Sequence, residues 1–209
     1  MDIDGFWELI ERSARETDTR KARLAWLENE LSQRSVEDIV GYYAGWKIAQ
    51  SRGCTIDLYA AYWFVFQKGS LNGFEYFVNW LISLGRSIFE QVADCPDRLI
   101  EVPEVLRLLE KQASYYSGSA RSLRSRAWTD DEDPEFERLA YVPYHVCEKI
   151  GRDVEDLHEA LQARSVGDGF PLIPGIAEAP RGEQWDYDDD QEVRRRLPRI
   201  ARYRGLQDS

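Results

Sequence analysis

The sequence has few histidines and cysteines, and none of them has the spacing of a metal site. His145 and His158 are the only histidines in 209 residues, and Cys54, Cys95 and Cys147 lie far apart. There is no Cys-x-x-Cys pair and no Cys/His cluster, so we expect reduced thiols, no metal and no other cofactor. Both histidines are expected to have structural roles, on the surface or hydrogen-bonded in the core.

The signature motifs of common enzyme classes are also missing. The chain contains no GxGxxG fingerprint, no phosphate-binding P-loop, no GxSxG elbow and no HExxH helix. The acidic run at residues 130–133 lacks the alternate spacing and the glycine of a calcium loop. No catalytic residue is therefore assigned, and the sequence argues against an enzyme more than for one.

Long apolar runs and a basic leader are absent as well. No stretch of about 18 uncharged apolar residues could span a bilayer. The start of the chain, MDIDGFWELIERS, lacks the charge and the apolar run of a signal peptide. Together with the cysteine usage, this predicts a cytoplasmic protein without a membrane association.

Positive charge is in deficit. The chain has 38 Asp and Glu against 27 Lys and Arg, a net charge of −11. Such a protein repels phosphate backbones, so a nucleic-acid partner is unlikely. The charge suits a basic protein or peptide partner, although solubility alone explains it in most acidic domains. The arginine-rich stretch at residues 194–204 could bind a phosphate or an acidic partner, but pairing with its own domain is favoured.

What is present predicts a folded helical protein. Hydrophobic residues make up 43% and aromatic residues 12%, enough for one sizeable core. Apolar residues recur at helical spacing behind suitable first residues. The residues expected to begin helices are Asp4, Asp18 or Thr19, Ser35, Thr55, Pro103, Asp133 and Asp153. The predicted fold class is therefore all-α, as a compact orthogonal bundle of many helices.

A helical hairpin at residues 57–92 is expected at the centre of this bundle. Its two apolar helices are joined by a polar turn at residues 68–72. We expect the second helix to run unbroken from Gly73 to Ala93, with Gly85 inside it allowing a close helix approach. Its apolar arc is wide enough to contact several neighbours, which is typical of a central helix.

The domain organisation is predicted from shifts in composition. Residues 1–164 form the helical domain, with an exposed insertion at 117–133 whose basic and acidic halves could pair. Pro143 is expected to kink or break the helix that Asp133 begins. Residues 165–209 form an extended Gly/Pro-rich strap and an arginine-rich terminal helix that packs on the same domain. Pro198 is expected to divide or end that helix.

Three segments carry a resemblance to a known family. They are FWELIE at residues 6–11, SxxGFxYFxxWLIxxGR at 70–86 followed by Pro96-Asp97, and PRGxxW at 180–185. In this order they resemble the bacterial domain of unknown function 4240, a resemblance that spans most of the chain except residues 117–133. It implies a shared fold but no established activity.

The chain departs from the family at two positions. Similar proteins usually have Ser-Asp-Asp at the turn and an arginine after the Phe-x-Tyr-Phe run, where this chain has Leu71, Asn72 and Val78. Either an active site has been lost, or a buried ion pair has been replaced by the apolar Leu71 and Val78. The second interpretation is favoured, because such a replacement is often neutral or stabilising.

Two functions from different classes follow. The first is a non-catalytic protein that binds a protein or peptide, in an accessory, regulatory or immunity-type role. The alternative is an enzyme or small-ligand-binding protein with a pocket near the turn that holds Ser70 and Asn72. The candidate binding residues are Ser70, Asn72, Glu75, Trp80, Arg86 and Trp128.

Two geometric arguments bear on these candidates. On one continuous helix Glu75 and Arg86 would lie about 16 Å apart along the axis, so they could not form one compact site unaided. A set of exposed aromatic anchors is conceivable, although core packing is favoured for two of its members, Trp63 and Trp80. The full set is Trp63, Trp80, Tyr116 and Trp128. The identity of the partner and the oligomeric state stay open.

Overall fold

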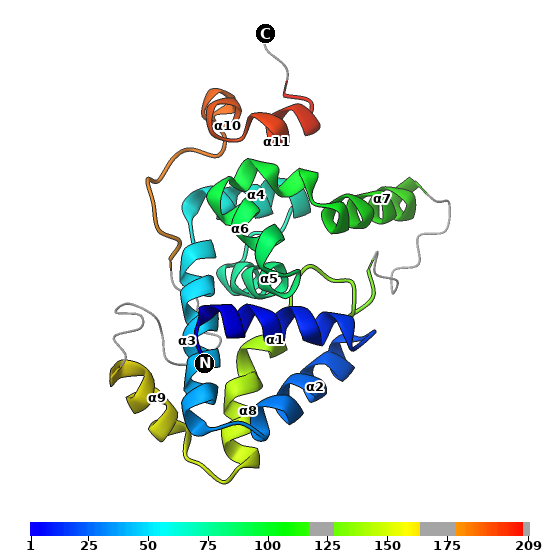
Figure 1. The fold of residues 1–209 in the computed structure, drawn as a ribbon. Helices are drawn as coiled ribbons and strands as arrows, with labels where there is room; N and C mark the ends of the chain where they lie inside the picture. The colour runs from blue at the N-terminus through cyan, green and yellow to red at the C-terminus, as the bar shows by residue number, and fades with distance from the viewer. Residues whose placement is uncertain (118–127, 164–178, 207–209) are drawn as a thin grey trace.

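The computed structural model describes residues 1–117, 128–163 and 179–206, and helices make up most of these ranges (Figure 1). In the part of the chain described, β-structure is limited to an isolated bridge between Thr55 and Arg181. The predicted all-α multi-helix fold is confirmed. The helices are α1 (Ile3–Arg15), α2 (Arg20–Ser32), α3 (Val36–Gly53), α4 (Ile56–Phe66), α5 (Leu71–Ser83), α6 (Arg86–Asp94), η1 (Pro96–Glu101), α7 (Pro103–Ser117), η2 (Glu137–Tyr141), α8 (Val142–Lys149), α9 (Val154–Ala163), α10 (Asp190–Arg196) and α11 (Pro198–Tyr203).

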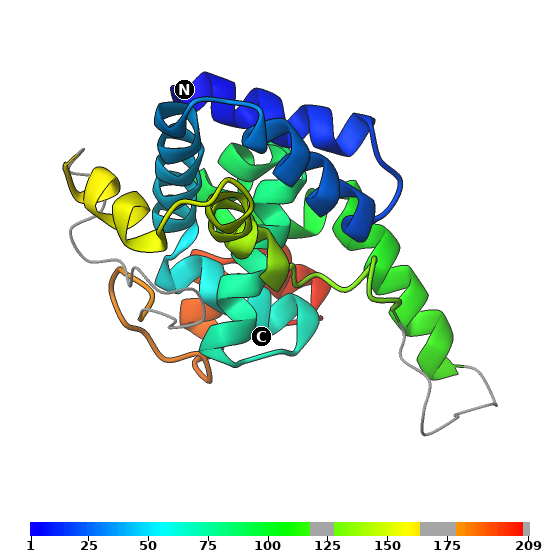
Figure 2. The ribbon, with the colours of Figure 1, turned by 90° about the horizontal axis from the view of Figure 1, so that it is seen from below.

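The long helix α3 contacts helices α1, α2, α5, α8 and α9. It runs along the left side of the view in Figure 1, and α1 and α5 lie across it, while α2 and α8 lie side by side below them. Helix α3 is buried around most of its circumference, from Ile39 to Ala49. Helix α7 extends outward from this body in both ribbon views (Figure 1 and Figure 2). The centre of the fold is therefore shared between α3 and α5.

Several helices begin where local chemistry places them. Thr19, Ser35, Thr55 and Ser70 each accept a hydrogen bond from a backbone N–H in the first turn of the following helix. The first helix differs from the prediction, because its N-cap is Asp2 and not Asp4. The terminal ammonium lies 2.7 Å from Asp38 Oδ1, which holds the start of the chain against α3 and lets the helix begin two residues earlier.

The predicted continuous helix from Gly73 to Ala93 is wrong. Helix α5 ends at Ser83, Gly85 adopts a positive φ of 99°, and α6 begins at Arg86. Few residues other than glycine adopt this conformation readily. The Arg86 N–H donates to Glu11 Oε1 at 3.2 Å, so a contact with α1 helps to fix the break. The apolar periodicity conceals the break, because Phe89 and Val92 on α6 also face the core.

The prediction that Asp133 begins a helix is also wrong. Residues 133–136 are irregular, and the Phe136 N–H donates to the Tyr76 carbonyl at 2.8 Å, which ties this segment to α5. The helical path resumes only at η2, and α8 begins with Pro143 in its first turn. Because proline is tolerated there, the predicted break before Pro143 is confirmed.

The predicted exposed insertion is wrong for Trp128, whereas Thr129, Asp130 and Asp131 are exposed as expected. The Trp128 indole is buried, donates to the Leu108 carbonyl at 2.9 Å and packs edge-on against Phe66. The acidic part that follows pairs with other elements, since Glu132 binds Arg107 and Lys111 of α7. Residues 118–127, which carry the basic half, lie outside the described residues.

The C-terminal segment lies at the top of the molecule in Figure 1, where α11 packs on η1 and α4. Its strap begins for the described residues at 179, because 164–178 lie outside them. Backbone bonds fasten it there, from Ile56 N–H to the Arg181 carbonyl and from Arg181 N–H to the Cys54 carbonyl. Helix α10 ends at Arg196 and α11 begins at Pro198, so the predicted division at this proline is confirmed.

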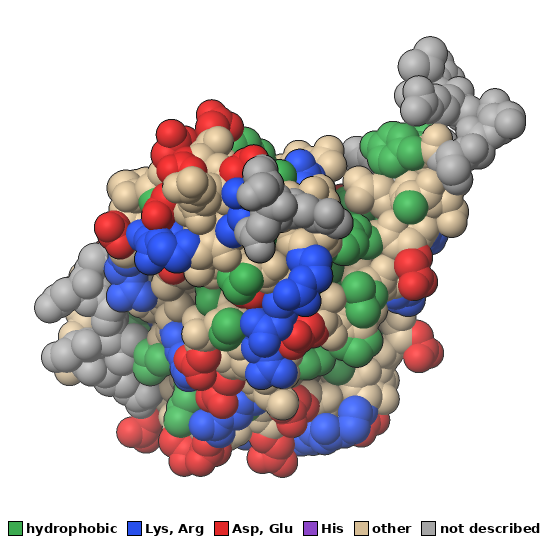
Figure 3. All heavy atoms as spheres, turned by 90° about the horizontal axis from the view of Figure 1, so that it is seen from above, with side chains coloured by type: hydrophobic (Ala, Val, Ile, Leu, Met, Phe, Trp, Pro, Cys, Tyr) green, Lys and Arg blue, Asp and Glu red, His purple; other side chains and the backbone are tan. Residues whose placement is uncertain are grey.

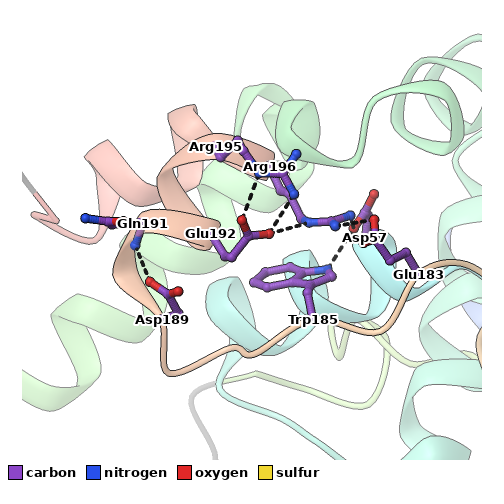
Figure 4. A network of polar contacts seen from close by, with 8 residues as sticks. All are labelled: Asp57, Glu183, Trp185, Asp189, Gln191, Glu192, Arg195 and Arg196. Carbon is purple, nitrogen blue, oxygen red and sulfur yellow. Dashed lines mark hydrogen bonds and ion pairs between the residues drawn. The ribbon is translucent and has the colours of Figure 1, made fainter.

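Arginines of this segment pair with carboxylates of the same chain, as favoured from the sequence. Arg196 reaches Glu192 and Glu183, and Figure 4 shows its guanidinium beside Trp185, whose indole donates to Asp57. From above, Lys and Arg side chains alternate with Asp and Glu across this end of the molecule (Figure 3). On this face the described residues therefore present charges of both signs.

Candidate functional site: an acidic groove beside the turn between α4 and α5

The turn between α4 and α5 is held against residues 133–135. Helix α4 ends because Gln67 adopts a left-handed conformation with φ of 56°. The next residue, Lys68, places its Nζ 2.8 Å from both Asp133 Oδ1 and Glu135 Oε1. Glu135 Oε1 also accepts a hydrogen bond of 2.9 Å from the Tyr62 hydroxyl. A half-buried network of one ammonium, two carboxylates and a phenol therefore fixes this turn.

Arg20 holds the same segment from the other side. Its guanidinium donates to the backbone carbonyls of Asp133 and Glu135, and its backbone N–H donates to Asp131 Oδ1 at 2.8 Å. The guanidinium also lies over the Phe136 ring, 4.9 Å from its centroid. Burial lowers the pKa of Arg20, and the nearby aspartates oppose that shift. The carboxylates of residues 130–137 are thereby presented from a fixed backbone.

A groove of about 530 Å³ lies along this segment. Three of its lining residues, Leu24, Tyr76 and Phe136, are apolar or aromatic. Its charged residues are the acids Asp130, Asp131, Asp133, Glu135 and Glu137 and the bases Arg20, Lys21 and Arg138. Because acids outnumber bases by five to three, the groove is net negative.

The groove combines this charge with an aromatic donor. The Tyr76 hydroxyl donates to Glu137 Oε1 at 3.1 Å. Burial and that carboxylate raise the pKa of Tyr76 to about 12, so the phenol stays protonated at neutral pH. The lining residues include no serine, cysteine or histidine. The arrangement favours binding a cationic group over nucleophilic chemistry.

The six residues predicted as binding candidates are only partly brought together. Ser70 caps α5 by accepting from the Gly73 N–H at 2.9 Å, and Asn72 is exposed on the first turn. Trp128 lies near this turn, with Lys68 Nζ 5.5 Å from its ring centroid. These three residues thus surround the turn, but Ser70 and Asn72 are not among the residues that line the groove.

The other three candidates lie elsewhere. Glu75 accepts a hydrogen bond of 3.2 Å from Gln50 of α3. Trp80 is buried in the core. Arg86 begins α6 and pairs with Asp4 and Glu90. The structure therefore disperses these residues over separate contacts.

Core packing, which was favoured for Trp80, is confirmed, and the exposed-anchor hypothesis is wrong for Trp128. Trp80 and Trp128 are buried, because both pack against Phe66. Tyr116 is 56% exposed at the end of α7. Core packing was favoured for Trp63, which is instead 36% exposed and packs against Tyr187 of the C-terminal segment.

The interpretation of Leu71 and Val78 as a buried replacement pair is half right. Val78 is 1% exposed and points towards Gly53, in the core. Leu71 is 42% exposed, because it is the first residue after the Ser70 cap and faces away from the core. The two side chains are also separated by two helical turns, about 10 Å.

The histidines have the structural roles expected of them. His145 Nδ1 lies 2.9 Å from Glu28 Oε1, which joins α8 to α2. His158 Nε2 lies 3.2 Å from the Tyr144 hydroxyl, which in turn lies 2.6 Å from the Tyr43 hydroxyl. Within the described ranges, no group of three or more His, Cys, Asp or Glu side chains could hold a metal ion, and no helix is long and apolar enough to cross a membrane.

Sequence reasoning missed the residues that build the groove. Arg20 and Glu135 are 115 positions apart, and Lys68 and Glu135 are 67 apart. The density of acids at residues 130–137 was a usable signal. Nothing local in the sequence, however, shows that Arg20 and Lys68 fix this segment from either side.

Comparison with known proteins places the chain among relatives of unestablished activity. Neither the curated proteins nor the solved structures contain a match to it. A family model described as a protein of unknown function (DUF4240) matches residues 1–149, which include α1 to α8. The resemblance seen in the sequence is thus confirmed, and the chain belongs to the DUF4240 family.

Proposed function

We propose that this protein is non-catalytic and binds a basic segment of another protein or a peptide in the acidic groove. An accessory, regulatory or immunity-type role fits such an activity. One observation carries the proposal: five carboxylates line a groove of about 530 Å³ whose other walls include Tyr76, Leu24 and Phe136.

The chemistry of the groove matches arginine and lysine side chains. A guanidinium can donate two hydrogen bonds to a carboxylate while its planar face stacks on an aromatic ring. The protein already uses this geometry internally, since Arg20 lies over Phe136 and donates to neighbouring carbonyls. Asp130, Asp131 and Glu137 are exposed at the groove and are the residues expected to meet an incoming cation.

The proposal is tested with a defined basic peptide. We would measure the binding of a short arginine- and glycine-containing peptide to the full chain by fluorescence anisotropy, at several salt concentrations. The expected result is binding that weakens with salt. The double variant Asp130→Asn/Glu137→Gln is expected to bind about tenfold more weakly, since rim charges contribute modestly to affinity.

The control changes the same charge elsewhere. Glu8→Gln/Glu16→Gln removes two exposed carboxylates, one on α1 and one at its C-cap, and leaves the groove intact. Equal weakening in both double variants would show a general charge effect and would refute the groove as the site. Absence of binding at low salt would refute the proposal itself.

The alternative, a small-ligand pocket near the turn, predicts a different outcome. The Ser70 Oγ atom is engaged in capping α5, which argues against a nucleophilic role. Argininamide, which carries a single side chain, should bind much more weakly than the peptide if a chain segment is the ligand. Equal affinity of both probes would favour the small-ligand alternative.

A further inference from the structure

A second cavity, of about 200 Å³, lies on the other side of Arg20. It is bounded by the connection between α1 and α2, the end of α5, the first turns of α7 and residues 131–136. Drug-sized ligands occupy roughly 300–1,000 Å³, so an occupant of this cavity is smaller. We refer to it as the α7 cavity.

Arg23 contributes a partly buried cation to the α7 cavity. Its Nε donates to Ser13 Oγ at 2.7 Å, and its Nη2 donates to the carbonyls of Ile10 and Ser83, each at 2.8 Å. Among the described residues, no carboxylate forms an ion pair with Arg23, and Nη1 has no hydrogen-bond acceptor. Burial accordingly lowers the pKa of this guanidinium to about 10. Buried charges are normally paired, so this group calls for an anion.

Glu104 contributes the opposite charge. It lies in the first turn of α7 and lines the same cavity. Its Oε2 atom is buried and accepts no hydrogen bond from any residue in the described ranges. A buried acceptor without a donor costs about 1–3 kcal/mol, and more when it is charged. This carboxylate therefore calls for a donor, ideally a cation.

Several other charged groups of the α7 cavity are bound within the protein, and Asp18 is a further, exposed carboxylate in its lining. Arg107 pairs with Glu132 at 3.1 Å, and the Arg20 N–H donates to Asp131. The remaining lining is mixed, with apolar side chains from Trp80, Leu84, Leu108 and Phe136 beside the polar Thr17, Thr19 and Ser83. The Arg23 guanidinium and the carboxylates of Glu104 and Asp18 thus line one small cavity.

We propose that the α7 cavity binds a small zwitterion of the free α-amino acid class. The ligand carboxylate accepts from Arg23, the ligand ammonium donates to Glu104, and an apolar side chain packs on Trp80. The inference goes beyond the proposed function, because it concerns a second cavity with a different ligand. The competing occupant is water, of which about six molecules would fit at roughly 30 Å³ each.

The experiment uses the full chain and defined probes. We would screen the twenty free L-amino acids by thermal shift and measure any hit by isothermal titration calorimetry. For the best hit, the matching amine without the carboxylate and the matching acid without the ammonium complete the set. The expected result is binding of the amino acid, with at least tenfold weaker binding of each single-charge analogue.

The decisive variant is Glu104→Gln, which preserves shape and removes the charge. It is expected to weaken binding of the amino acid at least tenfold. Glu110→Gln changes an exposed residue on the same helix and is expected to leave the affinity unchanged. Arg23 is less suitable as a test because its three hydrogen bonds hold α1, α2 and α5 together. Each variant is accepted only if its urea midpoint shows that it is folded under the assay conditions.

Three outcomes would overturn the inference. They are binding of no amino acid at millimolar concentration, single-charge analogues that bind as well as the zwitterion, and an affinity that Glu104→Gln leaves unchanged. None of them affects the acidic groove, whose test rests on Asp130 and Glu137.

Discussion

Replacing Asp97 with alanine is expected to release the C-terminal segment from the body of the protein. Asp97 lies in η1 and is 3% exposed. Its carboxylate accepts hydrogen bonds from the backbone N–H groups of Arg199 and Ile200, at 2.8 and 2.9 Å, and from Arg199 Nη1 at 3.1 Å. It therefore caps the first turn of α11 from a distant part of the chain.

The expected loss of stability follows from the two hydrogen bonds that backbone N–H groups donate to Asp97. A hydrogen bond to a charged group contributes about 1.5–3 kcal/mol, so losing two of them costs about 3–6 kcal/mol. Asp97→Asn keeps one acceptor oxygen and the shape, and is expected to cost about half as much. Arg199→Ala removes only a partly exposed side chain and keeps both backbone donors, so we expect little change.

The assay combines urea unfolding with hydrogen exchange. Midpoints and slopes give the change in the free energy of unfolding. If α11 detaches alone, the cost appears instead as faster exchange of the Ala201 and Arg204 amides, which are bonded within the α11 turn. The reasoning would be refuted if Arg199→Ala were as damaging as Asp97→Ala, because the ion pair and not the cap would then hold the segment.

Two further predictions concern the core and the acidic segment. Val78→Arg, which restores the residue usual in the family, places a charge in the core and should cost about 3–5 kcal/mol in urea unfolding; adding Leu71→Asp should not rescue it, because Leu71 is exposed two turns away. The Lys111 ammonium and the Thr129 N–H and hydroxyl lower the pKa of Glu132 from 4.5 to about 2. Because the pKa is lower in the folded state, the ionised carboxylate stabilises the protein above pH 4.5, and this stabilisation is lost as the pH falls towards 2. The stability advantage of the wild type over Glu132→Gln should therefore shrink across that window, and a constant difference in urea midpoints would contradict it.

Most helix starts were predictable because they depend on neighbouring residues, Asp4 and Asp133 being the exceptions. Thr19, Ser35 and Thr55 each bind a backbone N–H three residues ahead, and this spacing is visible in the sequence. Pro103 likewise begins α7, as its missing N–H allows. The all-α fold class followed from these starts and from the apolar periodicity between them.

The errors arise where a distant residue decides the local structure. The break at Gly85 is fixed in part by Glu11 on α1, and Trp128 is buried because Leu108 offers it a carbonyl acceptor. Residues 133–136 stay irregular because Arg20 binds their carbonyls and Tyr76 binds the Phe136 N–H. Periodicity within the segment carries no trace of these partners. The same holds for the acidic groove and the α7 cavity, whose charged residues come from Asp18, α2, α7 and residues 130–138.

The cap that Asp97 provides has a consequence for how the protein is made. Its partners Arg199 and Ile200 follow it by 102 and 103 positions, so during synthesis the carboxylate leaves the ribosome long before they do. Until then the carboxylate has no bond to α11 and is expected to be hydrated. Because domains form from the N-terminus onward during translation, α11 is expected to dock last. If synthesis is stalled before residue 197, the nascent chain should therefore form the helical body without α11 packed on η1.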